Sequence, residues 1–175
     1  MFKHSLFGLL CILLFSTCGK DNNFLFTMDY DLEFIIQPGL SPFGGIHGVS
    51  IKDIPTQFQN YLASNGITED QVVKISSGSA RISSLLPSSG YGFIQTAEIY
   101  ITNPMDLADT RLVFERLEVP QNTGQQLELL GSLIDSKRFL SEEAFNLNFE
   151  IRVRQTSPEL IRTRLEVEFR VEIDE

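Results

Sequence analysis

The sequence has no tryptophan, two cysteines and two histidines among its 175 residues. Cys11 lies inside an N-terminal apolar run of the kind that secretion removes, and Cys18 lies three residues after the end of that run. No cysteine remains beyond residue 18, so the sequence excludes a disulfide within the folded part. It also lacks the two cysteines around a tryptophan that antibody domains contain. The fold must therefore depend on its hydrophobic core.

Basic residues are fewer than acidic ones: 14 lysines and arginines against 23 aspartates and glutamates give a formal net charge of -9. Phosphate binding requires clustered lysine and arginine side chains, so we expect no nucleic-acid partner. The same charge excludes electrostatic attraction to an anionic bilayer.

The sequence also lacks catalytic motifs. His47 is the only histidine beyond the N-terminal run, and the glycines around it do not have the GxxxxGK[ST] or GxGxxG spacing of a phosphate-binding loop. No GxSxG motif surrounds Ser79 or Ser89. We therefore expect a protein that is not an enzyme and holds no cofactor.

The N-terminal residues have the layout of a secretory signal. Lys3 and His4 form a short basic start, an apolar run follows over residues 6–15, and small residues close it before Cys18. A bilayer-spanning helix needs about 20 apolar residues, so this run is too short for a permanent anchor. The sequence predicts a signal peptide over residues 1–17.

The segment FSTCG at residues 15–19 resembles a bacterial lipobox, in which the signal peptidase cuts before the cysteine and the cysteine carries lipid. Phe15 and Thr17 depart from its strictest form, and the looser form resembles lipoproteins of Bacteroidota-type bacteria. The resemblance implies lipidation at Cys18 and a place in the cell envelope, on the outer membrane and either periplasmic or surface-exposed. Two or three acyl chains would hold the protein stably, at about 0.8 kcal/mol per buried methylene. An ordinary cleaved signal is the alternative.

Residues 18–23 would form the lipidated N-terminus and a polar tether, and residues 24–175 one domain. Within it, apolar residues repeatedly fall on every second position, which is typical of strands with one buried face. The pattern predicts about seven strands, over residues 24–36, 71–86, 93–102, 111–119, 126–130, 145–153 and 165–173, with 49–54 as an optional short one. A bend is expected near Gly78, and one short helix from about Pro55 to Gly66.

The last two alternating runs are predicted to form a hairpin. Their charges favour a register that places Arg154 opposite Glu166 and Arg152 opposite Glu168, and disfavour one that places Arg152 opposite Arg164. The expected fold class is all-β, an antiparallel β-sandwich for which an immunoglobulin-like topology is one option. A small closed barrel is the alternative.

Two sets of residues are candidates for a binding site. Asp29, Asp31 and Glu33 would share one face of a strand and supply oxygen ligands for a hard cation, although a solvated outer face explains them equally well and is preferred. Tyr91 and Tyr100, expected in a loop or facing outward, are candidates for stacking on a glycan.

The favoured function is a non-enzymatic lipoprotein of the cell envelope that binds or supports another envelope component, with a protein as the favoured component. A surface glycan-binding module is the alternative, and a hydrolase is a third reading for which the sequence supplies no converging titratable groups.

Overall fold

The computed structural model describes residues 24–86 and 90–174. The predicted signal peptide, Cys18 and the tether lie outside the described residues, as does Ser89. The described strands are β1 (Phe24–Ile36), β2 (His47–Pro55), β3 (Val72–Ser84), β4 (Ile94–Asn103), β5 (Asp106–Arg116), β6 (Gln126–Gly131), β7 (Ala144–Val153) and β8 (Ile161–Ile173). The helices are α2 (Phe58–Asn65), the single turn α3 (Lys137–Leu140) and the 3-10 turn η2 (Glu69–Gln71).

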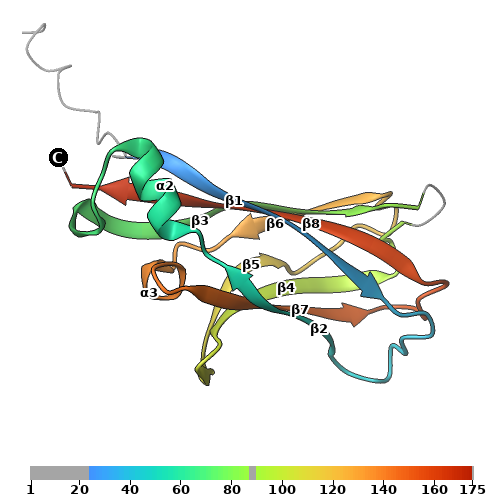
Figure 1. Cartoon of the computed structure of the whole chain (residues 1–175). Helices are drawn as coiled ribbons and strands as arrows, with labels where there is room; N and C mark the ends of the chain where they lie inside the picture. Colours follow the sequence, from blue (N-terminus) through green and yellow to red (C-terminus); the bar gives the residue numbers. More distant parts are fainter. Residues whose placement is uncertain (1–23, 87–89, 175) are drawn as a thin grey trace, which may run out of the picture.

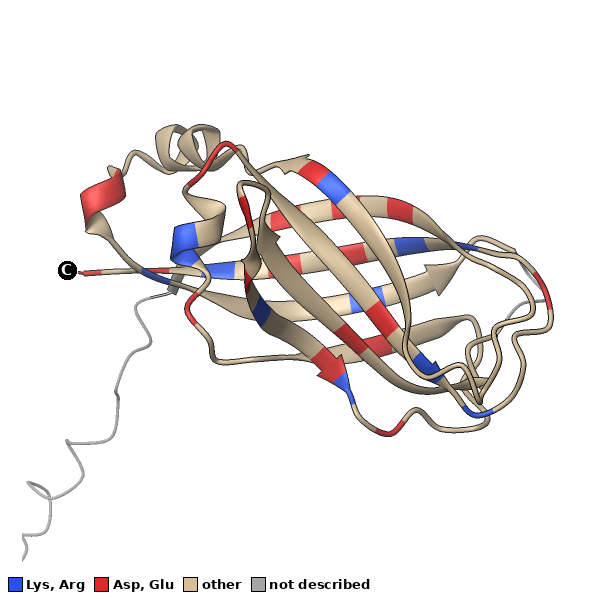
Figure 2. Ribbon diagram, turned by 90° about the horizontal axis from the view of Figure 1, so that it is seen from below, with Lys and Arg blue, Asp and Glu red and all other residues tan. Residues whose placement is uncertain are grey.

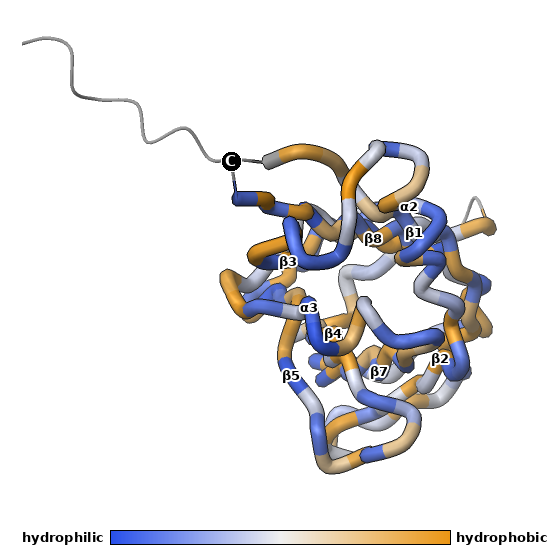
Figure 3. Tube along the Cα trace, turned by 60° about the vertical axis from the view of Figure 1, so that its left-hand side comes forward, coloured by the Kyte–Doolittle hydropathy of each residue, from blue (hydrophilic) through white to orange (hydrophobic). Residues whose placement is uncertain are grey.

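The strands form two layers, one of β1, β8, β3 and β6 and the other of β5, β4, β7 and β2 (Figure 1). All neighbouring strands are antiparallel, and the layers are joined where β6 meets β5 through two residue pairs. The alternation of hydrophilic and hydrophobic residues along the strands is visible in Figure 3, where α2 and α3 lie at the near end. One apolar core therefore lies between two layers that each expose a polar face.

The connections between the strands are those of a jelly roll. Six of the seven links between the described strands cross from one layer to the other, and only the link from β4 to β5 stays within a layer. Eight antiparallel strands connected in this way form a jelly roll. The predicted all-β sandwich is thus confirmed, with eight strands in place of about seven because the optional strand is β2. The strand order differs from that of an immunoglobulin domain.

The predicted hairpin of the last two strands is wrong. β7 pairs with β2 and β4, whereas β8 pairs with β1 and β3 in the opposite layer. Arg152 consequently lies opposite Thr96, and Glu166 lies opposite Arg81. Alternation determines which face of a strand is buried, but it does not determine the neighbouring strand. Here the two apolar faces contact each other across the core.

Aromatic rings fill the centre of this core. Phe169 of β8 has its ring centroid 5.5 Å from that of Phe114, 6.2 Å from Tyr30 and 6.5 Å from Phe145. The Tyr30 hydroxyl donates to the backbone carbonyl of Thr56 at 2.7 Å, and burial raises the pKa of Tyr30 above its usual value. Rings from both layers thus meet at Phe169, in contacts of the kind that add to simple area burial.

Two local predictions are confirmed by the backbone. The helix α2 ends at Gly66, whose φ of 68° is the left-handed conformation that glycine adopts most easily. The pairing of β3 with β8 shifts register between Ser77 and Ala80, around Gly78. A Cβ on Gly78 would lie 3.0 Å from the Glu168 carbonyl oxygen, so glycine allows the two strands to approach closely at this bulge.

Candidate functional site

The predicted candidates on β1 are placed as expected on the outer face of their strand, where Asp29, Asp31 and Glu33 are all exposed. Arg164 of β8 lies beside two of them, with its Nε 3.4 Å from Asp31 Oδ1 and its Nη2 3.8 Å from Glu33 Oε1. Within the described residues, no three histidine, cysteine, aspartate or glutamate side chains form a group that could hold a metal ion. These carboxylates form part of a solvated, ion-paired face.

The two tyrosine candidates are in different environments. Tyr91 is 0 % exposed, and its hydroxyl donates to Thr163 Oγ1 at 3.1 Å, so the expectation that it is accessible is wrong. Burial raises the pKa of Tyr91 to about 12. Its ring belongs to the core, and its backbone N–H donates to the carbonyl oxygen of Gly124. Tyr100 is half-buried on the outer face of β4.

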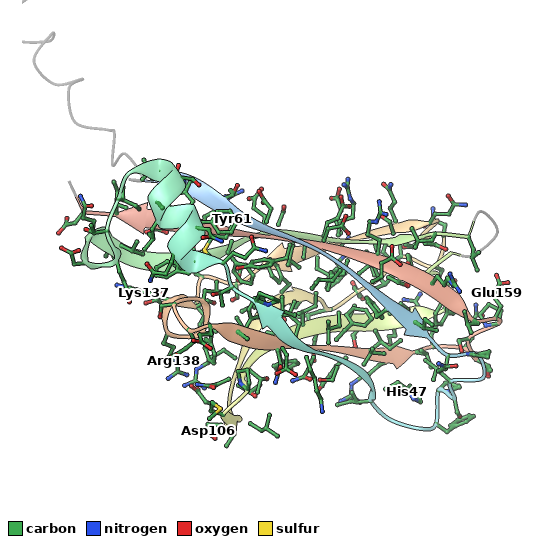
Figure 4. The ribbon with its side chains drawn as sticks, in the orientation of Figure 1. His47, Tyr61, Asp106, Lys137, Arg138 and Glu159 are labelled. Carbon is green, nitrogen blue, oxygen red and sulfur yellow. The ribbon has the colours of Figure 1, made fainter. Side chains whose placement is uncertain are left out.

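His47 binds its own loop. Its Nε2 lies 2.9 Å from the carbonyl oxygen of Ser41, so the imidazole links the start of β2 to the middle of the loop that precedes it. Figure 4 shows His47 at the opposite end of the molecule from Lys137 and Arg138.

Three glutamates lie side by side across the outer face of the layer that contains β2, β7, β4 and β5. Glu98 of β4 lies directly opposite Glu150 of β7 on one side and Glu115 of β5 on the other. We call Glu150, Glu98 and Glu115 the acidic row. Like charges directly opposite each other on antiparallel strands are destabilising. This arrangement therefore lowers the stability of the free protein.

None of the three carboxylates forms an ion pair with a basic side chain of the described residues. Two glutamates of β8 in the other layer differ in this respect. Glu166 is 2.8 Å from the guanidinium of Arg81, and Glu168 is 3.1 Å from that of Arg170. Figure 2 views the molecule from below, onto the layer with the acidic row, and shows the charged positions along its strands. The acidic row is therefore an uncompensated part of the described surface.

Tyr100 adjoins the acidic row and responds to it electrostatically. Its hydroxyl donates to Glu98 Oε2 at 3.0 Å. Desolvation, this hydrogen bond and the charges of Glu98, Glu150 and Glu115 together raise the pKa of Tyr100 to about 12. The phenol therefore stays protonated as a donor at neutral pH, and it fixes the orientation of the central carboxylate.

A chain of polar side chains crosses the same face next to the acidic row. Ser50 Oγ donates to Asn148 Oδ1 at 2.6 Å, Asn148 Nδ2 donates to Thr102 Oγ1 at 2.9 Å, and Thr102 Oγ1 lies 2.9 Å from Thr110 Oγ1. These residues come from all four strands of the layer. The network holds the face in one side-chain arrangement, which lowers the entropy that a binding partner would have to remove.

Neutralising the centre of the acidic row is expected to stabilise the protein. Glu98→Gln removes two unfavourable neighbours and keeps an acceptor for Tyr100, so the free energy of unfolding should rise by about 0.2–1 kcal/mol. Urea unfolding at low ionic strength measures the change. The gain should shrink in about 1 M salt, where the Debye length falls to about 3 Å. Glu166→Gln, which loses its ion pair with Arg81, should bring no gain. A lower free energy of unfolding for Glu98→Gln than for the wild-type protein would contradict this explanation.

Sequence reasoning missed the acidic row. Alternation along one strand indicates only that residues such as Glu98 and Glu150 face outward, because it is a local signal. The signal that would have placed these residues together is the pairing of β4 with β7, which joins segments separated by two further strands in the sequence.

No protein-family model matches the sequence, and no curated protein matches it. Among solved structures, a decameric BFDV capsid protein is similar at 9 % identity and a TM-score of 0.34, covering 84 % of this chain and 98 % of that chain. A dimeric latent PorU from Porphyromonas gingivalis is similar at 10 % identity and a TM-score of 0.24, covering 88 % of this chain and 14 % of that chain. At these TM-scores neither likeness bears on function.

Proposed function

We propose that this chain is a non-enzymatic, lipid-tethered jelly roll of the cell envelope that binds a positively charged protein through the outer face of β2, β7, β4 and β5. The observation that carries the proposal is the acidic row: Glu98 lies between Glu150 and Glu115, and none of them is ion-paired within the described residues.

A basic partner would remove the cost that the acidic row imposes on the free protein. Lysine or arginine side chains placed between the carboxylates replace repulsion by attraction. Close charge pairs at protein interfaces contribute about 1.5–7 kcal/mol in favourable cases. Complementary charge also speeds association, by up to a few orders of magnitude at low salt. The fixed network around Asn148 and Thr102 supports such recognition because the face does not have to reorganise.

The membrane part of the proposal rests on the lipobox-like segment, with Cys18 as the acylated residue. No helix within residues 24–86 and 90–174 is long and apolar enough to span a membrane. A covalent lipid on Cys18 would place the jelly roll beside the bilayer and leave both of its outer faces accessible to other envelope proteins.

The test is crosslinking in intact envelopes, followed by purification of the acylated protein. Glu98→Gln/Glu150→Gln should reduce the yield of crosslinked partner at least about tenfold. A tenfold change in affinity corresponds to about 1.4 kcal/mol, which is no more than one close charge pair at an interface contributes. The matched control is Glu166→Gln/Glu168→Gln, which changes charge equally on the opposite layer and should retain the partner. The amount of partner recovered with the wild-type protein should fall as the salt concentration rises. Equal recovery with both double variants would overturn the proposal.

Glycan binding is the second candidate, because Tyr100 lies among amide, hydroxyl and carboxylate groups on the same face. These groups are hydrogen-bonded to one another and surround a half-buried ring, which leaves little free surface for stacking. A crosslinked species that persists after complete glycosidase treatment favours a protein partner over a glycan.

A further inference from the structure

The loop between β1 and β2, residues 37–46, presents an aromatic ring to solvent. Phe43 near its tip is 97 % exposed, and the side chain of Ile46 is also exposed. The loop precedes His47 and lies at the same end of the molecule (Figure 4). A fully exposed phenylalanine gains free energy by entering an apolar environment, because its surface leaves water. Phe43 is therefore available to anchor this end of the molecule.

The base of the loop is fixed by Ser157, a buried residue that precedes β8. Its carbonyl oxygen accepts the N–H of Gly39 at 3.0 Å, and its hydroxyl oxygen accepts the N–H of Leu40 at 3.0 Å. The same hydroxyl donates to the carbonyl oxygen of Gln37 at 2.9 Å, and the N–H of Ser157 donates to that of Leu40 at 3.3 Å. The loop thus has a defined shape before any partner binds, which lowers the entropic cost of binding.

Near the tip, Ser41 bonds to the backbone donors around Phe43. Its hydroxyl oxygen accepts the N–H of Phe43 at 3.2 Å, and its carbonyl oxygen accepts the N–H of Gly44 at 3.0 Å. Pro42, between them, has no N–H. A backbone group without a hydrogen-bond partner costs free energy in an apolar medium. A tip whose donors are bonded within the loop can therefore enter such a medium more easily.

Charged side chains are also sparse at this end. Residues 37–46 contain no lysine, arginine, aspartate or glutamate, although the chain has a net charge of -9. The segment that holds the loop, residues 154–160, carries one arginine and one glutamate, Arg154 and Glu159. Charged groups oppose entry into lipid, and a basic cluster would indicate attraction to anionic headgroups. This end has the character of a surface that contacts uncharged, apolar material.

We propose that the loop of residues 37–46 inserts Phe43 and Ile46 into the interfacial region of a lipid bilayer. Aromatic and aliphatic side chains are favoured at the boundary between headgroups and acyl chains. A bilayer fits the loop better than a protein does, because protein interfaces contain about one hydrogen bond per 100–200 Å² and the donors of the tip are already bonded. The contact would not depend on anionic lipid.

The reach of the chain limits how the sandwich would lie on the bilayer. β1 has 13 residues, so the loop is about 40 Å from Phe24. Cys18 is six positions before Phe24, and a fully extended chain of that length reaches about 20 Å. A lipid on Cys18 and the ring of Phe43 would therefore meet one bilayer only with the strands inclined by no more than about 30° to its plane. This orientation rests on the proposed acylation, whereas insertion of the loop does not.

The test uses the protein purified from envelopes and mixed with phosphatidylcholine vesicles. The chain contains no tryptophan, so Phe43→Trp introduces a single fluorescent reporter. Its emission should shift to shorter wavelength on vesicles, and phospholipids brominated on their acyl chains should quench it. Leu133→Trp is the matched control. Leu133 is equally apolar and 85 % exposed, but it lies in a pocket lined by Lys74, Arg170 and Glu172, so its reporter should stay in water.

Ile46→Trp reports on insertion when Phe43 is changed. Adding Phe43→Ala should lower the ratio of inserted to free loops about tenfold, which corresponds to about 1.4 kcal/mol. Adding Phe43→Leu should retain most of the insertion. Palmitate labelling is measured separately on the same protein. Labelled protein without lipid quenching of Phe43→Trp would overturn this inference alone, whereas quenching without label would overturn only the acylation. A spectral shift that requires added envelope protein would also overturn the inference.

Discussion

Phe169→Ala is expected to lower the free energy of unfolding by about 3–5 kcal/mol. Phe169 is 0 % exposed, and its ring contacts Tyr30 and Phe145 as well as Phe114. Alanine would leave a cavity where rings from both layers meet, and the surrounding strands are too constrained to close it completely. Typical domains are stable by about 5–15 kcal/mol, so this single change should remove a large share of the total.

Equilibrium unfolding in urea, followed by circular dichroism, measures this loss. Phe43→Ala is the matched control, because Phe43 is 97 % exposed and its truncation should leave stability nearly unchanged. A loss below about 1 kcal/mol for Phe169→Ala would contradict the assignment of Phe169 to the centre of the core.

Cys18→Ala is expected to abolish incorporation of labelled palmitate completely and to leave an unprocessed precursor. The reason is chemical: the thiol that would carry the lipid is gone, and no other cysteine remains beyond the predicted signal peptide. Without the lipid, the folded domain would have no electrostatic attraction to an anionic membrane, because the net charge of the chain is -9.

Cys11→Ala is the control for this experiment. It removes the other cysteine from the same N-terminal region, within the part expected to be cleaved, and labelling should persist. Labelling that survives in Cys18→Ala would show that Cys18 is not the acylated residue, and a wild-type protein without label would favour the ordinary cleaved signal.

The positions of the strands were predictable because alternation is a local property of the chain. The prediction of a strand over residues 24–36 coincides with β1, and the bend near Gly78 and the helix end at Gly66 were likewise readable from glycine placed in or beside a periodic run. Each of these features depends on the conformation of a few consecutive residues.

The pairing of the strands was not predictable in the same way. The runs that contain Phe149 and Phe169 have matching alternation and complementary charges, which favoured a hairpin, yet they lie in opposite layers. Their apolar faces gain more by contacting each other across the core than exposed charge pairs gain by pairing, at about 0–1 kcal/mol each. The acidic row and the burial of Tyr91 depend on these long-range pairings and were missed for that reason.

The position of β8 has a consequence for when this chain can fold. β8 lies between β1 and β3, and it is the only strand that pairs with β1. β1 therefore cannot pair until β8 has been synthesised. At synthesis rates of about 5–20 residues per second, this delay lasts on the order of ten seconds. Folds dominated by such distant pairings also form slowly once complete. The order of the strands by itself therefore delays completion of the sheet until the last strand has been synthesised.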